Sequence, residues 1–290
     1  MPQTNIQRKP LWLNKKVDLN KVRQLKSLLA DLGLFSVCQS ALCPNISECF
    51  SRGRVTFLIL GDVCTRNCRF CGIQKGRPKD VDYSEPAKVA EAVGRIKAKY
   101  GLRHIVITSV TRDDLPDGGA GVFKEVISKI RQSAPEVKIE VLIPDFKASQ
   151  QSLETVISAR PDIIGHNIET VPSLYSKVRP MADYSRSLEV LKIIKKTAPH
   201  IYTKSGLMLG LGETEEELLS VFSDLCRVGC DFLSLGQYLR PSFKHFPVKE
   251  YILPEKFEAL KNKAKEYGFL YVASGPYVRS SYLAEEYLKS

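Results

Sequence analysis

Residues 55–71 read VTFLILGDVCTRNCRFC, and this stretch decides the fold. Its first half is a run of apolar residues that predicts a strand buried on both faces. Its second half is a loop that carries Cys64, Cys68 and Cys71 in a C-x3-C-x2-C spacing. Parallel α/β folds place catalytic groups at the carboxyl ends of their strands, so we expect this loop at the active site.

Apolar runs and amphipathic helical runs alternate through the rest of the chain. Five further strands are expected at residues 104–109, 138–143, 162–168, 203–209 and 232–238. Helices are expected at residues 19–32, 86–99, 122–130, 184–196, 214–228 and 254–267. This alternation predicts an α/β fold with a parallel sheet and right-handed crossovers. Six units are too few for a closed eight-fold barrel, so we predict a partial (β/α)6 barrel, with a doubly wound sheet as the alternative.

Composition and charge narrow the classes of function. The chain has 290 residues and a net charge of +11, which suits an acidic partner or simply a basic surface. Its Lys and Arg residues are spread over most segments, which makes nucleic-acid binding the weaker interpretation. No apolar run reaches the roughly eighteen residues of a membrane span. Residues 1–16 are polar and basic and lack the apolar core of a secretory signal, so we expect a cytoplasmic protein.

The cysteines point to metal. Six of the eight lie within residues 38–71, which would be unusual for disulfides in a chain without an export signal. Cys38, Cys43 and Cys49 follow a C-x4-C-x5-C spacing that differs from common zinc pairs. Three thiolates from one loop can hold three irons of a four-iron cluster and leave the fourth iron open. A structural zinc site is the alternative for either trio, and ordinary buried thiols are a further alternative for Cys38, Cys43 and Cys49.

With Phe70 directly before its last cysteine, the loop at residues 64–71 resembles the signature of the radical S-adenosylmethionine (SAM) family. The resemblance implies that Cys64, Cys68 and Cys71 hold a [4Fe–4S] cluster whose open iron chelates SAM. It implies that one electron from the cluster cleaves SAM to a 5′-deoxyadenosyl radical, which abstracts hydrogen from an unactivated carbon. The protein would supply binding, orientation and exclusion of side reactions.

Longer blocks narrow the resemblance to the lipoyl synthase family. They are residues 38–49, 61–68, 108–119, 166–170, 204–214, 236–239 and 279–282, and they span nearly the whole chain. The last block is Arg-Ser-Ser-Tyr. One departure is Ser47, which stands where the family usually has glycine and would be strained if the position required a positive φ.

The resemblance implies sulfurtransferase activity (EC 2.8.1.8) that inserts two sulfur atoms, at C6 and C8, into an octanoyl chain on a carrier lysine. Two SAM molecules would be cleaved, and a second [4Fe–4S] cluster, the auxiliary cluster, would be dismantled to supply the sulfur. Cys38, Cys43 and Cys49 would hold the auxiliary cluster, with Ser281 as the fourth ligand and Ser280 as the alternative. A serine oxygen is a harder donor than a thiolate and could leave iron more readily.

The resemblance implies further site residues around SAM. They are Phe70 near adenine, Thr108 and Ser109 at the SAM amino group, Asn167 and Glu169 at the ribose hydroxyls, and Gly210 beside a bound group. Strand-end caps, a core aromatic and a turn glycine are the structural alternatives. Arg179 and Lys204 either meet carboxylates or are solvated.

The expected organisation has three parts. Residues 1–53 form an N-terminal extension with the auxiliary loop, residues 54–270 the partial barrel, and residues 271–290 a segment that closes the auxiliary cluster. Expected partners are an octanoylated, acidic lipoyl carrier domain and reduced ferredoxin or flavodoxin as electron donor, with no nucleic acid and no membrane. The alternatives are another sulfur-inserting radical SAM enzyme, such as one resembling biotin synthase, or a basic metal-binding module for nucleic acid.

Overall fold

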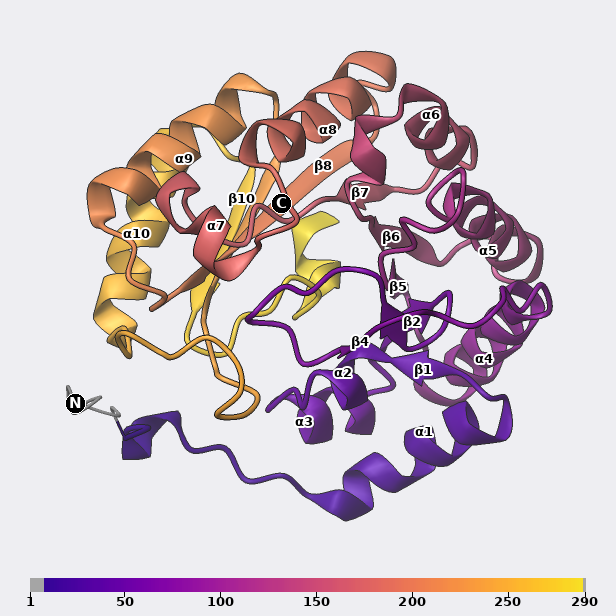
Figure 1. Cartoon of the computed structure of the whole chain (residues 1–290). Helices are drawn as coiled ribbons and strands as arrows, with labels where there is room; N and C mark the ends of the chain where they lie inside the picture. Colours follow the sequence, from indigo (N-terminus) through magenta and orange to yellow (C-terminus); the bar gives the residue numbers. More distant parts are fainter. Residues whose placement is uncertain (1–7, 289–290) are drawn as a thin grey trace.

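The strands form an open, curved wall with helices around its outside (Figure 1). A computed structural model describes residues 8–288, so the outermost residues of both predicted terminal parts lie outside the described residues. Within that range the large sheet has the order β1-β2-β5-β6-β7-β8-β9-β10, and β1 and β10 are its two unpaired edges. The predicted partial barrel is therefore confirmed. Neighbouring strands from β2 to β10 run parallel, whereas β1 is antiparallel to β2.

The six predicted strands are all present. They are β2 (Thr56–Ile59), β5 (His104–Ser109), β6 (Lys138–Leu142), β7 (Ile163–Gly165), β8 (Tyr202–Leu209) and β9 (Phe232–Gln237). Two edge strands, β1 (Phe35–Ser36) and β10 (Tyr271–Gly275), were not predicted. Because β10 pairs with β9 along its whole length, the parallel sheet continues into the segment that we expected to begin at residue 271. Strands β3 (Val63–Cys64) and β4 (Gln74–Lys75) pair with each other in a separate two-stranded ribbon.

The predicted helices also form. They are α1 (Leu19–Asp31), α4 (Glu85–Tyr100), α5 (Ala120–Ser133), α8 (Tyr184–Thr197), α9 (Glu215–Arg227) and α10 (Pro254–Glu266). Helix α9 begins as expected, because Thr214 and Glu217 make a reciprocal capping box. Helices that were not predicted are α2 (Val37–Ser40), α3 (Ile46–Ser51), α6 (Gln150–Ser158) and α7 (Tyr175–Val178). Single 3-10 turns are η1 (Leu11–Leu13), η2 (Phe146–Ala148), η3 (Pro172–Leu174) and η4 (Ala284–Leu288).

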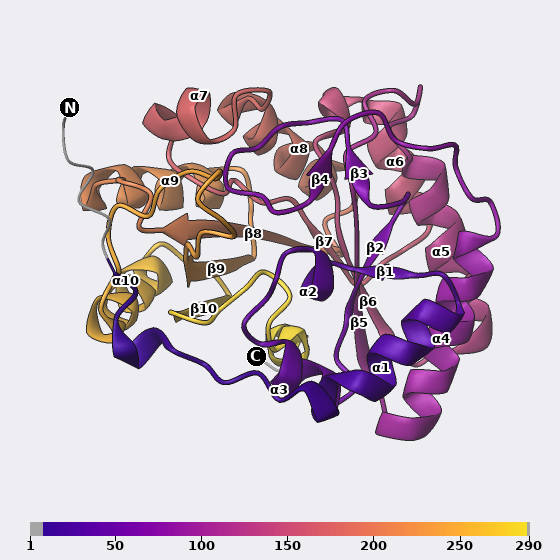
Figure 2. The same ribbon diagram turned by 60° about the horizontal axis from the view of Figure 1, so that its bottom comes forward.

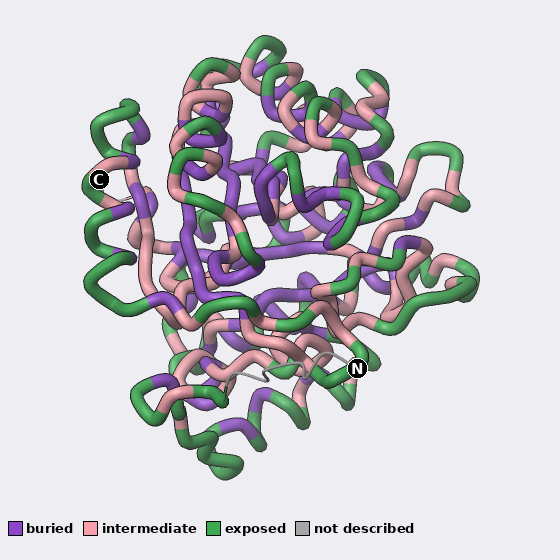
Figure 3. Tube along the Cα trace, turned by 60° about the vertical axis from the view of Figure 1, so that its left-hand side comes forward, coloured by how far each residue is buried: buried purple, intermediate pink, exposed green. Residues whose placement is uncertain are grey.

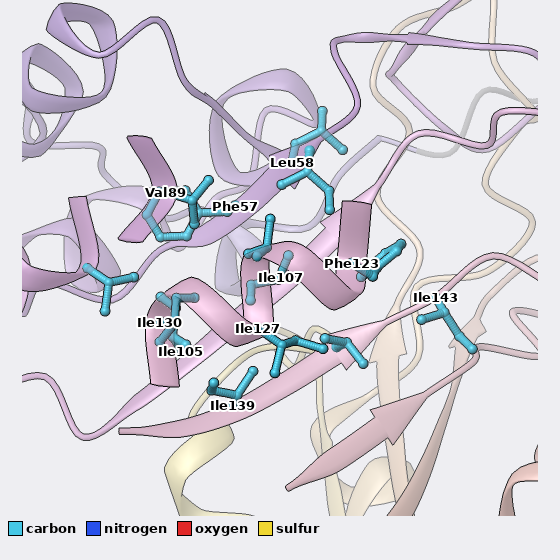
Figure 4. Close-up of a cluster of buried hydrophobic side chains, with 14 of the residues drawn as sticks. Phe57, Leu58, Val89, Ile105, Ile107, Phe123, Ile127, Ile130, Ile139 and Ile143 are labelled. Carbon is cyan, nitrogen blue, oxygen red and sulfur yellow. The ribbon is translucent and has the colours of Figure 1, made fainter. Parts of the chain in front are cut away.

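The apolar faces of the helices pack on the outer face of the sheet. Figure 4 shows Phe57 and Ile107 of strands β2 and β5 beside Ile127 and Ile130 of helix α5, and all four are fully buried. Burying one such side chain contributes roughly 1.5–3 kcal/mol, so this layer fixes the strand ends that carry the site. Figure 3 shows the same arrangement, with buried strands enclosed by helices that expose their outer turns. No helix within residues 8–288 combines the length and the apolar character needed to cross a bilayer.

The region that follows strand β1 lies beside the C-terminal segment. Figure 2 shows α2 and α3 beside the C-terminal turn η4. The amide of Asn45 donates to the Tyr277 carbonyl at 2.7 Å, and the Arg54 side chain pairs with Glu285. Turn η4 inserts Tyr287 at the amino ends of the strands, where its ring packs 5.4 Å from that of Phe232. The C-terminal segment therefore runs from strand β10 to the loop that carries Cys38, Cys43 and Cys49.

Candidate active site

A single cavity of about 1580 Å³ lies at the carboxyl ends of the parallel strands. All three cysteines of the 64–71 loop line it, and so do Cys38 and Cys43 of the auxiliary loop (residues 38–49). The two cysteine trios lie on opposite sides of strand β2 in the sequence: the auxiliary loop precedes this strand and the 64–71 loop follows it. The fold brings both to one chamber.

Backbone pairing closes the 64–71 loop onto the barrel. Strand β3 pairs with β4, and the Thr65 amide donates to the Thr111 carbonyl at 3.1 Å. The amides of Arg66 and Thr111 lie 3.4 and 3.3 Å from the sulfur of Cys64 and donate hydrogen bonds to it. Hydrogen bonds to the sulfurs are one of the means by which proteins set the potential of an iron–sulfur cluster.

The guanidinium of Arg66 anchors the middle of this loop. It donates to Asp113 at 2.7 and 2.9 Å and to Asp145 at 2.8 and 2.6 Å, in two bidentate pairs. Burial opposes the charge on Arg66, but its hydrogen bonds to the two carboxylates outweigh burial and raise the pKa of Arg66. Burial likewise opposes the charge on Asp145, yet its hydrogen bonds with Arg66 hold its pKa well below the usual range. The loop is thus tied to the ends of two other strands.

The thiols of this loop are partly buried. Burial raises the pKa of Cys71 to about 12, and burial also raises the pKa of Cys68. Such thiols are protonated at neutral pH without a metal, and they become good ligands when a bound cation displaces the proton. Three thiols that line one large cavity therefore fit a cluster with one iron left open to a substrate.

The auxiliary trio surrounds a second, smaller hollow next to the large cavity. Cys38, Cys43 and Cys49 line it together with Ser281. Burial and the neighbouring Cys43 raise the pKa values of Cys38 and Cys49 to about 12. Within residues 8–288 no three His, Cys, Asp or Glu side chains converge closely enough to share a single metal ion. A four-iron cluster is larger than one ion, and its ligands stand around a hollow of this kind.

The two serines of the Arg-Ser-Ser-Tyr block take different places. The hydroxyl of Ser281 accepts a hydrogen bond from Thr56 at 2.7 Å and faces the auxiliary trio. The hydroxyl of Ser280 donates to Asn167 at 3.1 Å and lines only the large cavity. The donor set of three thiols and the Ser281 hydroxyl thus fits the auxiliary cluster.

Ser47 is accommodated without strain. It lies within helix α3, and its φ is not positive. Its hydroxyl accepts a hydrogen bond from the Asp18 amide at 2.7 Å. The departure from the family's glycine therefore leaves the loop intact and adds a tie to the N-terminal segment.

Five of the six predicted SAM contacts line the large cavity: Phe70, Thr108, Ser109, Asn167 and Glu169. The hydroxyl of Ser109 is buried and has no hydrogen-bond partner among residues 8–288, which leaves it available to a bound group. The hydroxyl of Thr108 already donates to the Leu142 carbonyl at 2.7 Å. These placements bring the five residues together at one cavity.

Gly210 does not line the cavity. Its φ is +92°, and a Cβ built on it would lie 2.2 Å from the Glu250 carbonyl oxygen. A left-handed backbone conformation and this close approach both require glycine, so the turn alternative accounts for the residue. The sequence pattern could not separate the two explanations, because both demand the absence of a side chain.

Asn167 and Glu169 form a pair after strand β7. The side-chain amide of Asn167 donates to a carboxylate oxygen of Glu169 at 3.1 Å. Burial raises the pKa of Glu169, against the opposing charge of Arg179. Glu169 also adopts a positive φ of 70°, an uncommon conformation for a residue with a side chain, which places its carboxylate toward the cavity.

Several residues of the site escaped the sequence reading or were left open by it. Arg179 is buried, and its guanidinium donates to the carbonyls of Asn167 and Ile168 at 3.1 and 2.9 Å. His166 is buried at the cavity wall, and burial followed by the charge of Arg179 lowers its pKa to about 4. Lys204 lies outside the cavity lining and meets a carboxylate, that of Glu140, at 2.9 Å. For His166 and Lys204 the signal was only a polar residue inside or just after a buried strand, whereas Arg179 follows helix α7 and had no such signal.

The two remaining cysteines lie away from the cavity. Cys226 belongs to helix α9, and Cys230 lies in the segment that follows this helix. The thiol of Cys230 is buried, and it lies 3.4 Å from the Phe232 carbonyl. Both pack with the core.

Comparison with known proteins agrees with this geometry. The model of the radical SAM superfamily matches residues 58–225. Among solved structures, methylornithine synthase superposes with a TM-score of 0.55 at 13% identity, covering 86% of this chain and 82% of that one. The SuiB enzyme of Streptococcus suis bound to SAM superposes with a TM-score of 0.58 at 10% identity, covering 80% and 54%. The fold and the cysteine loop define a radical SAM protein.

Curated relatives specify the family within this class. The lipoyl synthase of Caldicellulosiruptor saccharolyticus is 56% identical over 97% of this chain and 98% of its own length. That of Geobacter sulfurreducens is 55% identical over 98% and 92%. The chain belongs to the lipoyl synthase family. Its activity is that of a radical SAM sulfurtransferase (EC 2.8.1.8), with SAM and two [4Fe–4S] clusters as cofactors, and both cysteine motifs are present.

Proposed function

We propose that this chain inserts sulfur at C6 and C8 of an octanoyl-lysine on a lipoyl carrier domain, and that both cysteine trios serve this reaction. The observation that carries the proposal is the shared cavity, which Cys38 and Cys43 line together with Cys64, Cys68 and Cys71. A sulfur donor must stand within reach of the carbon that loses hydrogen, because the encounter has to outpace side reactions. One chamber lined by both trios meets that need.

When bound, the cluster on the 64–71 loop supplies the electron that cleaves SAM, and the auxiliary cluster supplies the sulfur. The residues of the chain bind and orient these groups. Cys64, Cys68 and Cys71 hold the first cluster, while Arg66 fixes their loop. The free hydroxyl of Ser109 suits the amino group of SAM.

The remaining SAM contacts are proposed from the same cavity. Asn167 and Glu169 present an amide and a carboxylate, which suit the two ribose hydroxyls. Phe70 offers a ring to adenine, and Thr108 adds to the amino-group side. Gly210 contributes by keeping the loop before helix α9 close to Glu250, without touching SAM.

The lining also suits the octanoyl chain. Apolar side chains from five strands or their ends face the cavity: Leu58, Val110, Leu142, Leu207, Met208 and Tyr238. They bind an alkyl chain by burying its surface, at roughly 25 cal/mol per Å². They also exclude water from the reacting carbons.

Ser281 is the fourth ligand that we propose for the auxiliary cluster. It shares the smaller hollow with Cys38, Cys43 and Cys49, whereas Ser280 does not. The exchangeable serine oxygen suits a cluster that must be opened, since it is bound less firmly among sulfur-ligated irons than a thiolate.

The proposed protein substrate docks at the cavity mouth. Cationic side chains line the cavity at exposed or half-exposed positions: Arg8, Lys9, Lys75, Arg240 and Lys249. Neither carboxylate that lines it, Asp145 or Glu169, is exposed. An acidic lipoyl domain would be steered to such a rim and would present its lysine arm to the opening.

We also propose reduced ferredoxin or flavodoxin as the electron donor, because cleavage of SAM requires a low-potential one-electron reductant. A cytoplasmic location, where thiols stay reduced, remains a prediction.

Anaerobic reconstitution followed by assay tests the proposal. The reconstituted chain should release methionine and 5′-deoxyadenosine with an octanoyl-lysine peptide and should form the lipoyl product. Dethiobiotin, offered in parallel, should give no product. Turnover of dethiobiotin alone would instead assign a biotin-synthase-like reaction.

A further inference from the structure

Ser280 and Ser281 are consecutive residues that both line the large cavity, but only Ser281 also lines the hollow of the auxiliary trio. Ser281 accepts from Thr56 at 2.7 Å and lines the hollow of the auxiliary trio. Ser280 donates to the side-chain oxygen of Asn167 at 3.1 Å and lines the large cavity. A displacement of one residue necessarily displaces its neighbour, because a single peptide unit joins them.

Asn167 carries the contact onward. Its oxygen accepts from Ser280, and its NH2 group donates to Glu169 at 3.1 Å. Both ends of the amide are therefore engaged, which selects one rotamer and one orientation of the group. A continuous path of hydrogen bonds runs from Ser280 to the pair that we propose for the ribose of SAM.

The segment around these serines has little freedom to absorb a displacement. The carbonyl oxygen of Val278 lies so close to strand β9 that a Cβ at Gly236 would come within 2.1 Å of it. The carbonyl of Tyr277 accepts from Asn45 of the auxiliary loop at 2.7 Å. The side chain of Arg279 is half-buried among the same groups and donates to the Val278 carbonyl at 2.7 Å. A tightly held strap transmits a shift better than a loose one.

We propose that Ser280 is a positioning residue that couples SAM binding at Asn167 and Glu169 to the seating of Ser281 at the auxiliary cluster. The inference rests on the proposed roles of these three residues. Ser280 holds Asn167 ready for SAM while the auxiliary site is complete, and a bound SAM in turn favours the strap position in which Ser281 reaches the cluster. Coupling between two binding sites is reciprocal, so each site reports on the other.

Equilibrium binding of SAM to the anaerobically reconstituted full-length chain tests this coupling without any turnover. Ser280→Ala should weaken SAM binding about three- to tenfold, the range of one lost hydrogen bond. It should keep about eight irons per chain, because Ser280 is not a ligand. Ser280→Thr, which keeps the hydroxyl, should restore most of the affinity. Ser242→Ala is the matched control, since Ser242 lines the same cavity but bonds within its own loop to His245.

A thermodynamic cycle separates coupling from a merely structural role. Replacing Cys38, Cys43 and Cys49 by Ala should weaken SAM binding severalfold when Ser280 is present and leave it unchanged in the Ser280→Ala background. Equal effects in both backgrounds would overturn the proposal, and so would unaltered SAM affinity in Ser280→Ala. Loss of about four irons from Ser280→Ala would make it a ligand instead. Because no octanoyl substrate is used, failure of the proposed sulfur insertion would show separately, in the peptide assay.

Discussion

The two cysteine loops are held in different ways. The 64–71 loop is bound from within the barrel, through the β3–β4 ribbon, amides on the sulfur of Cys64 and the doubly paired guanidinium of Arg66. The auxiliary loop is held by residues from both ends of the chain. Lys15 donates to Asn45 and Glu48, and Tyr282 donates to Glu48 at 3.2 Å.

This difference matches the proposed fates of the two clusters. A cluster that acts repeatedly needs a rigid, buried frame whose potential stays constant. A cluster that is dismantled and rebuilt needs a frame that can open without unfolding the barrel, and the half-exposed contacts of Glu48 with Lys15 and Tyr282 provide that. The 64–71 loop thus provides a rigid site, and the auxiliary loop provides a site whose cluster can be replaced.

The largest expected effect is the loss of each cluster in turn. Replacing Cys64, Cys68 and Cys71 by Ala should remove about four irons and abolish both SAM cleavage and lipoyl formation. Replacing Cys38, Cys43 and Cys49 by Ala should also remove about four irons and abolish lipoyl formation, yet SAM cleavage should persist. Iron analysis and chromatography of 5′-deoxyadenosine measure both. Persistent lipoyl formation in the second variant would refute its role as sulfur donor.

Removal of the Arg66 side chain should destabilise the rigid loop strongly. Arg66→Ala leaves the buried carboxylate of Asp145, whose side chain is 1% exposed, without its main partner, at a cost of about 3–5 kcal/mol. Urea unfolding measures this change. Arg186→Ala is the matched control, because Arg186 contacts the same carboxylate at 3.4 Å from a position that is 36% exposed. It should cost less than about 1 kcal/mol. Equal effects of the two variants would contradict the assigned frame.

The same pair predicts how stability depends on acid. The pKa of Asp145 is lowered in the folded chain, so the stability that it contributes is fully present above the ordinary aspartate pKa of ~3.9. That contribution is lost as the pH falls from there through the lowered pKa of the folded state. Urea midpoints between pH 6 and pH 3 should therefore fall less steeply in Arg66→Ala than in the unaltered chain. Parallel curves would show that Arg66 does not set this pKa.

The smallest expected effect concerns the contacts that Lys15 makes with the auxiliary loop. Lys15→Ala removes a partly exposed ion pair with Glu48, at 2.7 Å, and should lower the free energy of unfolding by less than about 1 kcal/mol. It should nevertheless speed the release of auxiliary iron to a chelator severalfold, because Lys15 also holds Asn45 beside the cysteines. Lys88→Ala, which breaks the exposed pair with Asp82, serves as control. An unchanged rate of iron release would show that Lys15 does not stabilise the auxiliary loop.

Local patterns carried much of the fold and of the metal site. Buried strands such as β5 appear as continuous apolar runs, and a trio of cysteines within a dozen residues stays close whatever the fold. Strand β10 was missed because Ala273, Ser274 and Gly275 interrupt its apolar run, and helix α6 because its stretch is short and polar. The sheet supplies the neighbours that stabilise both.

Long-range pairing limited the rest of the site prediction. The contacts of Arg66 with Asp145 and of Ser280 with Asn167 join residues 79 and 113 positions apart. No local periodicity encodes such pairs, because they depend on where the strands end in space. Gly210 shows the converse limit, since a glycine required by packing has the same sequence signature as one required by a ligand.

The most direct test of the central claim is a count of iron and sulfide before and after a single turnover. The reconstituted chain, given SAM, reductant and an octanoyl-lysine peptide, should start with about eight irons and finish with about four, as one lipoyl group forms. The irons that remain should be those held by Cys64, Cys68 and Cys71. A lipoyl product formed while all eight irons stay bound would contradict the account.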